Sequence, residues 1–125
     1  MVLTGPGLNE WKTGVPFIYD VYGLAEPTLG NEPALLAEVL GVTWEQRRSD
    51  YRGEYFQAQG PSPIGGRLVL QSNDLRDETG DYLQLPDFPD HRFLLFVNKS
   101  QQPDEVRQRL AGLPQWAFLR RRELD

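Results

Sequence analysis

The stretch His91 to Asn98, HRFLLFVN, decides the fold. Five apolar residues follow one another in it without polar alternation, which is typical of a strand that is buried on both faces. We therefore expect this strand to occupy a central position in a sheet.

Four other segments are expected to supply the remaining strands. The segment 15–24 combines β-branched and aromatic residues, 67–71 (RLVLQ) is short and apolar, and 116–122 (WAFLRRR) closes the chain. The segment 42–58 reads as a hairpin that turns near Arg52-Gly53, with its second strand through Tyr55 and Phe56.

Two helices are predicted from their end signals. Asn31 is suited to the N-cap, Pro33 to the first turn and Gly41 to the left-handed residue after the end, so a helix is expected over 32–40. A second helix is expected to be capped by Ser100 or Gln102 and to end at Gly112. The acids of its first turn and the arginines of its later turns favour the helix dipole.

The order of these elements predicts an α+β domain. We expect one domain over residues 1–125, a two-layer sandwich of the ferredoxin-like or split βαβ type, with a mostly antiparallel sheet and two helices. Residues 1–14 are expected to form an irregular arm, and residues 72–90 a long acidic and aromatic loop. The 125 residues contain no cysteine, no secretory leader and no membrane-length apolar run, so a cytoplasmic location is the expectation.

The net charge of −5 resides in one short block, residues 74–90. Its only base is Arg76, and the remainder of the chain is neutral. A block of one sign that also carries aromatic residues is typical of a surface that meets a cationic partner. Its acids are Asp74, Asp77, Glu78, Asp81, Asp87 and Asp90.

Catalytic, cofactor and nucleic-acid motifs are not found. His91 is the only histidine, so a structural hydrogen bond to a nearby carbonyl or carboxylate is favoured over catalysis. The glycines 65–66 fit neither a phosphate loop nor a dinucleotide motif, and Arg120 to Arg122 stand in a chain with a pI of about 4.9. No cofactor, metal, membrane or nucleic acid is therefore expected. A weak divalent site at Asp74, Asp77, Glu78 and Asp81 stays open.

Aromatic residues beside these charges are candidates for partner contacts. Tyr51 and Tyr55 flank a glycine turn in SDYRGEYF (49–56), which equally suits a hot spot or a plain hairpin. Tyr82 and Phe88 lie in the acidic block, where Pro86 and Pro89 order the backbone that presents them. The alternative is a loop whose aromatic rings fold back onto the core.

The segments SDYRGEYF (49–56) and NDLRDETGDYLQLPDFPDHRFLLFV (73–97) resemble the central part of small single-domain immunity proteins that bacteria carry beside polymorphic or contact-delivered toxins. This resemblance implies stoichiometric binding of a cognate basic, nuclease-like toxin or other cationic protein. It also implies that no catalytic residue is needed. The six acids would face the toxin, with Tyr82 and Phe88 as anchors.

Two other functions remain open from the sequence. The chain could be a small-molecule-binding or regulatory ferredoxin-like module that self-associates, so both a monomer and a weak homodimer are compatible with it. An enzyme that uses carboxylates alone, with Asp20, Asp50 or Asp87 as general base, would need two carboxylates in contrasting environments.

Overall fold

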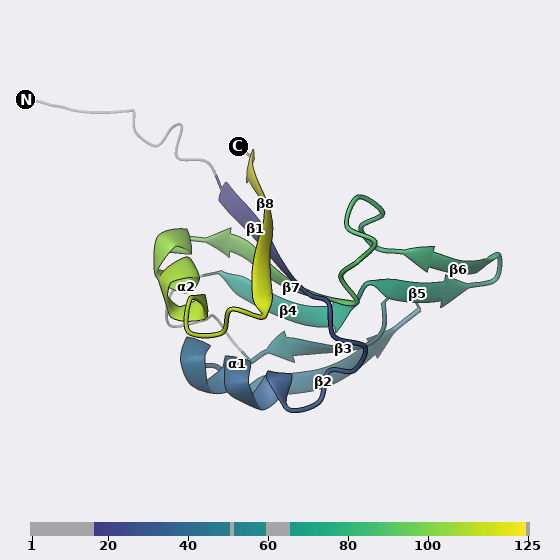
Figure 1. Ribbon diagram of the computed structural model, residues 1–125, viewed down its shortest axis with the longest axis horizontal. Helices are drawn as coiled ribbons and strands as arrows, with labels where there is room; N and C mark the ends of the chain where they lie inside the picture. The colour runs from purple at the N-terminus through teal and green to yellow at the C-terminus, as the bar shows by residue number, and fades with distance from the viewer. Residues whose placement is uncertain (1–16, 51, 60–65, 125) are drawn as a thin grey trace, which may run out of the picture.

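Residue 93 begins the strand around which the sheet is built. The computed structural model describes residues 17–50, 52–59 and 66–124. Six strands form one antiparallel sheet in the order β2-β3-β4-β7-β1-β8, and a separate hairpin joins β5 to β6 (Figure 1). The elements are β1 (Phe17–Leu24), α1 (Glu32–Leu40), β2 (Trp44–Ser49), β3 (Gly53–Ala58), β4 (Arg67–Ser72), β5 (Asp74–Asp77), β6 (Gly80–Leu83), β7 (Phe93–Ser100), α2 (Pro103–Leu110) and β8 (Trp116–Leu124).

The central position of β7 is confirmed. It pairs with β4 on one side and with β1 on the other, and Leu95 lies opposite Leu70 and Tyr22 in the two ladders. Leu94, Leu95 and Val97 have no exposed surface. The unbroken apolar run of the sequence therefore reflects burial on both faces of the sheet.

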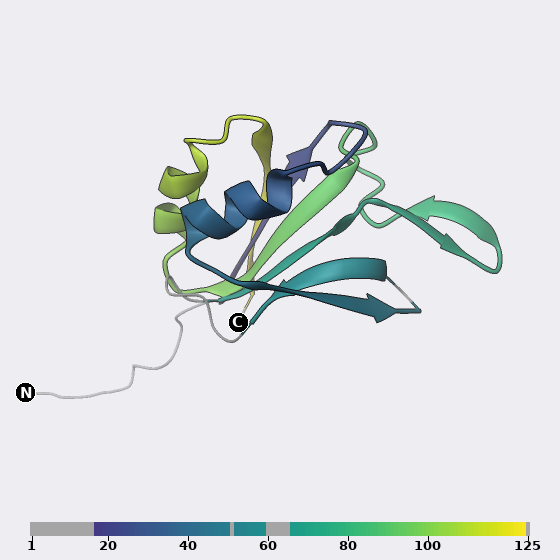
Figure 2. The same cartoon turned by 90° about the horizontal axis from the view of Figure 1, so that it is seen from below.

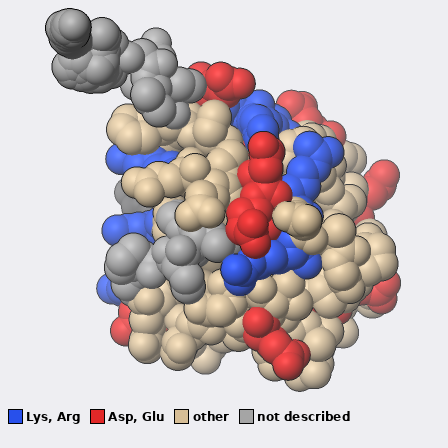
Figure 3. All heavy atoms as spheres, turned by 90° about the vertical axis from the view of Figure 1, so that its left-hand side faces the viewer, with Lys and Arg blue, Asp and Glu red and all other residues tan. Residues whose placement is uncertain are grey.

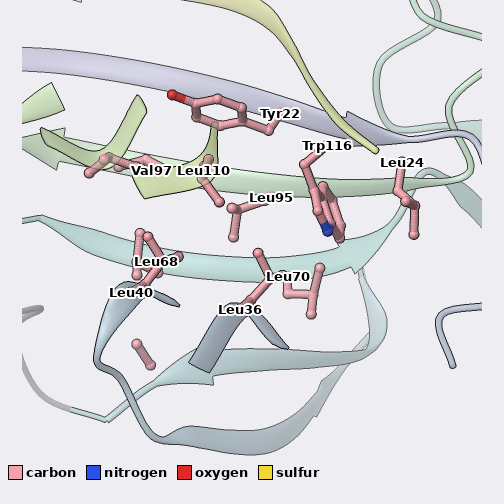
Figure 4. Packing of buried hydrophobic residues seen from close by; sticks show 12 residues of the cluster. Tyr22, Leu24, Leu36, Leu40, Leu68, Leu70, Leu95, Val97, Leu110 and Trp116 are labelled. Atoms are coloured by element: carbon pink, nitrogen blue, oxygen red, sulfur yellow. The ribbon is translucent and has the colours of Figure 1, made fainter. Parts of the chain in front are cut away.

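Both helices cover the same face of the sheet (Figure 2). Leu36 and Leu40 of α1 and Val106 and Leu110 of α2 are buried against the sheet, where Figure 4 shows the packed side chains. The strands contribute Tyr22, Leu24, Ala58, Leu68, Leu70, Leu95, Val97 and Trp116 to this core. Among the described residues, no helix lies on the opposite face of the sheet.

The sequence signals predicted the bounds of α1 correctly but placed the end of α2 too late in the chain. Helix α1 has the predicted bounds, and Gly41 adopts the left-handed conformation with φ of 68°. The Asn31 side chain makes no capping hydrogen bond, so the proline in the first turn is the stronger start signal. Helix α2 ends at Leu110, before the predicted Gly112, and the Ser100 hydroxyl accepts a hydrogen bond from the Gln102 amide at 3.2 Å.

The α+β class, the single domain, the antiparallel sheet and the two helices are confirmed. The expectation of one loop over 72–90 is corrected, because residues 74–83 pair as the hairpin β5–β6 and only the part that follows is irregular. The ferredoxin-like topology is not established by a sheet of six strands with an added hairpin. The arm over 1–14 lies outside the described residues, and no described helix is long and apolar enough to cross a membrane.

Candidate functional site

The acidic block forms a hairpin that projects from the sheet and a loop that returns to β7 (Figure 1). We call its six acids the acidic surface, and all six are exposed in the structure. Four of them lie on the hairpin or its turn, and two lie on the loop. The acidic surface consists of Asp74, Asp77, Glu78, Asp81, Asp87 and Asp90.

The hairpin turn is held by Asp77. Its carboxylate accepts hydrogen bonds from the Thr79 amide at 2.8 Å and from the Thr79 hydroxyl at 2.6 Å. The hydroxyl bond is the main reason why the pKa of Asp77 lies below its ordinary value. Because this carboxylate is stabilised in its charged form, the tip of the hairpin carries negative charge at neutral pH.

The loop over 84–92 is fixed to the domain by Asn73, which is fully buried at the junction of β4 and β5. Its side-chain amide donates to the carbonyl oxygens of Phe88 at 3.0 Å and His91 at 2.9 Å. Its side-chain oxygen accepts from the Leu85 amide at 2.8 Å. The backbone that presents Asp87 and Asp90 is therefore ordered by a satisfied buried side chain.

Charge pairing differs between the acidic surface and the end of the molecule at α2. Arg76 binds Asp81 at 2.9 Å, and the other five acids of the surface form no ion pair with a described residue. On α2, Glu105 pairs with Arg109, and Asp104 lies 3.6 Å from Arg121. Acidic and basic side chains are correspondingly interleaved at that end of the molecule (Figure 3). The acidic surface thus keeps most of its charge available to a partner.

The aromatic candidates differ in exposure. Tyr82 on β6 is 38 % exposed, and Phe88 is half-buried in the loop. Tyr55 is buried on β3 with the Arg52 guanidinium 5.1 Å from its ring centre, which leaves it little surface to offer a partner. Tyr51 lies outside the described residues. Tyr82 and Phe88 therefore remain the better placed anchors.

A cleft of about 390 Å³ lies between the two hairpins and was not foreseen from the sequence. Arg48 and Arg52 from the β2–β3 side line it together with Asp74 and Arg76 of the acidic block. Asp50 and Glu54 also line it, so the β2–β3 side adds two arginines and two acids and no net charge. The β2–β3 side of the cleft therefore extends the polar surface next to the acidic surface without cancelling the negative charge of the acidic surface.

Two of the residues considered for catalysis, Asp20 and His91, are buried or half-buried, whereas Asp50 and Asp87 are exposed. Asp20 has no exposed surface, and both of its carboxylate oxygens are bound by Arg121. The His91 ring lies against Gly23, and its Nδ1 is buried without a hydrogen-bond partner among the described residues. We expected the imidazole to form a hydrogen bond with a nearby carbonyl or carboxylate, and the described residues supply no such partner at Nδ1. Within the described ranges, no three potential ligands lie close enough together to hold a metal ion.

Asn73 is the residue of this site that the sequence did not reveal. Three of its hydrogen-bond partners are backbone carbonyls 12 to 18 residues further along the chain. An asparagine that is followed by an acid is common at turns and in loops, so no local pattern separates it from an ordinary surface residue. Only its complete burial marks its role.

Comparison with protein-family models, with curated proteins and with solved structures yields no significant match to this chain.

Proposed function

We propose that the protein is a stoichiometric binding protein that uses the acidic surface to dock onto a cationic partner, as an immunity protein does with its toxin. The observation that carries the proposal is the display of the six acids on an ordered, projecting hairpin and loop. Five of the six have no ion pair with a described residue. Carboxylates held in this way steer a cationic protein and raise the association rate.

Affinity in such a complex comes from a few buried apolar contacts rather than from the rim charges. Tyr82 and Phe88 are the described aromatic residues of the acidic block, one on the hairpin and one on the loop. Because Asn73 fixes the carbonyl of Phe88, the loop loses little conformational entropy on binding. We propose that these two rings anchor the partner and that the acids orient it.

The test begins with the product of the neighbouring gene as the candidate partner, expressed alone and together with this chain. A basic product that is toxic alone, harmless in co-expression and recovered in a one-to-one complex supports an immunity role. Association kinetics at several salt concentrations then locate the surface. Triple reversal of Asp77, Asp81 and Asp87 to Lys is expected to slow association by about tenfold or more and to remove most of its salt dependence.

A matched control reverses the charge of three exposed acidic residues outside the acidic block. Glu26, Glu38 and Glu123 are exposed and lie outside the acidic block. Their triple reversal to Lys changes the net charge equally, and we expect much faster association than with the first variant. Equal slowing by both variants would mean that total charge, and not this surface, governs the encounter.

The second candidate function is a regulatory module of the ferredoxin-like type that self-associates. It is favoured by the position of β1 between β7 and β8, which α2 connects, since this is a split βαβ arrangement. In this proposal, β2 and β3 are an insertion that widens the sheet. Sedimentation of the purified chain over a range of concentrations tests it, and a monomer at every concentration would count against it.

A further inference from the structure

We propose that the helix-free face of the sheet holds a binding site for a small organic anion with a phosphate or carboxylate group. The site is a hollow of about 660 Å³ at the end of the sheet where β4 begins and β7 ends. Its size is within the range of sites for small molecules. We call it the basic hollow, and its polar lining consists of Tyr19, Gln57, Arg67, Asn98 and Lys99.

The polar lining residues come from four adjacent strands, while Ala58, which also lines the hollow, belongs to the helix-covered core. Arg67 lies opposite Asn98 in the β4–β7 ladder, and Tyr19 stands on the neighbouring strand β1. Leu68 and Val97, their neighbours in sequence, point into the helix-covered core. Strand alternation therefore directs the polar side chains to the opposite face.

Two cations of the basic hollow have no acidic partner among the described residues. Neither Arg67 nor Lys99 forms an ion pair with any residue in the part of the chain that the structure describes. Arg122, opposite Tyr19 in the β1–β8 ladder, adds a third cation on this face. Two positive charges beside amide and hydroxyl donors are the groups that recognise a phosphate or carboxylate.

A β-bulge positions Lys99. Ile18 pairs with Ser100 and Asp20 with Val97, so Asn98 and Lys99 together face the single residue between them on β1. Lys99 has φ of 56° and is the only described residue other than glycine with a positive φ. Such a conformation is uncommon for a residue with a side chain, and bulges of this kind re-aim side chains beside functional sites.

Gly66 allows the bulge to pack closely against the start of β4. A Cβ atom at Gly66 would lie 2.8 Å from the Asn98 carbonyl oxygen and 2.9 Å from the Ser100 Cα, and its φ is 89°. Only glycine satisfies both conditions without displacing backbone atoms. The geometry of the basic hollow thus depends on two unusual backbone positions that face each other.

An apolar contact lies at the rim. Phe17 is 48 % exposed and lies opposite Leu124, which is 45 % exposed. The Phe17 ring centre is 5.2 Å from the Lys99 ammonium. An anion with an aromatic or apolar portion would place its charge on Arg67 and Lys99 and its apolar portion on Phe17. This inference does not rest on the proposed partner surface, because β4 separates the basic hollow from the hairpin that follows Ser72.

The test is an NMR titration of the full chain, labelled on its amides, with phenyl phosphate, inorganic phosphate and benzoate. Phenyl phosphate is expected to give saturable shifts at Gly66, Asn98 and Lys99, with weaker binding of inorganic phosphate. If benzoate binds equally well, a carboxylate is accepted; if it does not, the site selects phosphate. The absence of saturable shifts with all three probes would overturn the proposal.

Variants distinguish a built site from a general charge effect. Two variants, Arg67→Gln and Lys99→Asn, are each expected to weaken phenyl phosphate binding by about tenfold. Asparagine is chosen at position 99 because it tolerates the left-handed conformation. Arg92→Gln removes one exposed charge near the acidic block and is expected to have no effect. Equal weakening by Arg92→Gln would overturn the site. Phe17→Ser is expected to abolish the advantage of phenyl phosphate over inorganic phosphate.

Discussion

Arg121 donates two hydrogen bonds, of 2.8 and 2.9 Å, to the two oxygens of the fully buried Asp20 carboxylate. The two residues face each other in the β1–β8 ladder, so the pair joins the edge strand to the interior of the sheet. The hydrogen bonding that Arg121 donates to the Asp20 carboxylate is the main reason why the pKa of Arg121 is raised further above its ordinary value. The edge strand β8 is therefore held by a charge pair as well as by its backbone ladder.

Arg121→Gln is expected to destabilise the domain by about 3 kcal/mol, because it leaves the Asp20 carboxylate buried without a compensating charge. Arg122→Gln is the matched control. Arg122 is the next residue, is exposed and forms no ion pair with a described residue, so its replacement should change stability by less than about 0.5 kcal/mol. Urea unfolding of the three proteins measures both values. Equal losses in the two variants would contradict the importance of the pair.

Tyr22 is expected to make the fold sensitive to alkaline pH. Burial, followed by the charge of Asp20, raises the pKa of its phenol from 10.0 to about 12. Between these values the unfolded chain loses the proton while the folded chain keeps it. Below pH 10 the titration of Tyr22 therefore does not lower the free energy of unfolding. As the pH rises from 10 towards 12, the free energy of unfolding falls by at most about 1.4 kcal/mol per pH unit.

Tyr22→Phe tests this titration and the environment of the hydroxyl together. The hydroxyl is buried without a hydrogen-bond partner among the described residues, so its removal at neutral pH should be neutral or stabilising by about 1 kcal/mol. The variant should also have a shallower decline of unfolding free energy between pH 10 and 12. Tyr19→Phe, at a half-buried position, is the control for the loss of a phenol hydroxyl as such. A loss of stability in Tyr22→Phe at neutral pH would indicate that the hydroxyl is hydrogen-bonded.

The sequence predicted those features that depend on local signals. The apolar run at 93–97 identified the central strand, and Pro33 with Gly41 located the first helix. The sequence did not reveal the hairpin β5–β6, because its charges and its glycine are equally typical of a loop and its only buried apolar residue is Leu75. The basic hollow was also missed, since Arg67 and Lys99 are 32 positions apart and become neighbours only through strand pairing.

Asn73 provides the most direct test of whether the acidic loop is ordered before a partner binds. Asn73→Ala removes the donor to the Phe88 and His91 carbonyls and the acceptor for the Leu85 amide, all in a buried position. We expect a loss of about 2 to 4 kcal/mol, together with faster hydrogen exchange at the loop amides. Ser72→Ala is the control, because the hydrogen bonds of the Ser72 hydroxyl with described residues are confined to the neighbouring Asp74 backbone.

Asn73→Asp separates the two roles of this side chain. The carboxylate can still accept from the Leu85 amide, but it cannot donate to the carbonyl oxygens, and these would face a negative charge. At neutral pH the aspartate variant is therefore expected to be less stable than the alanine variant. Acidification should partly restore it, since the protonated form donates one hydrogen bond. Unchanged hydrogen exchange in both variants would mean that the prolines of the loop, and not Asn73, hold Asp87 and Asp90 in place.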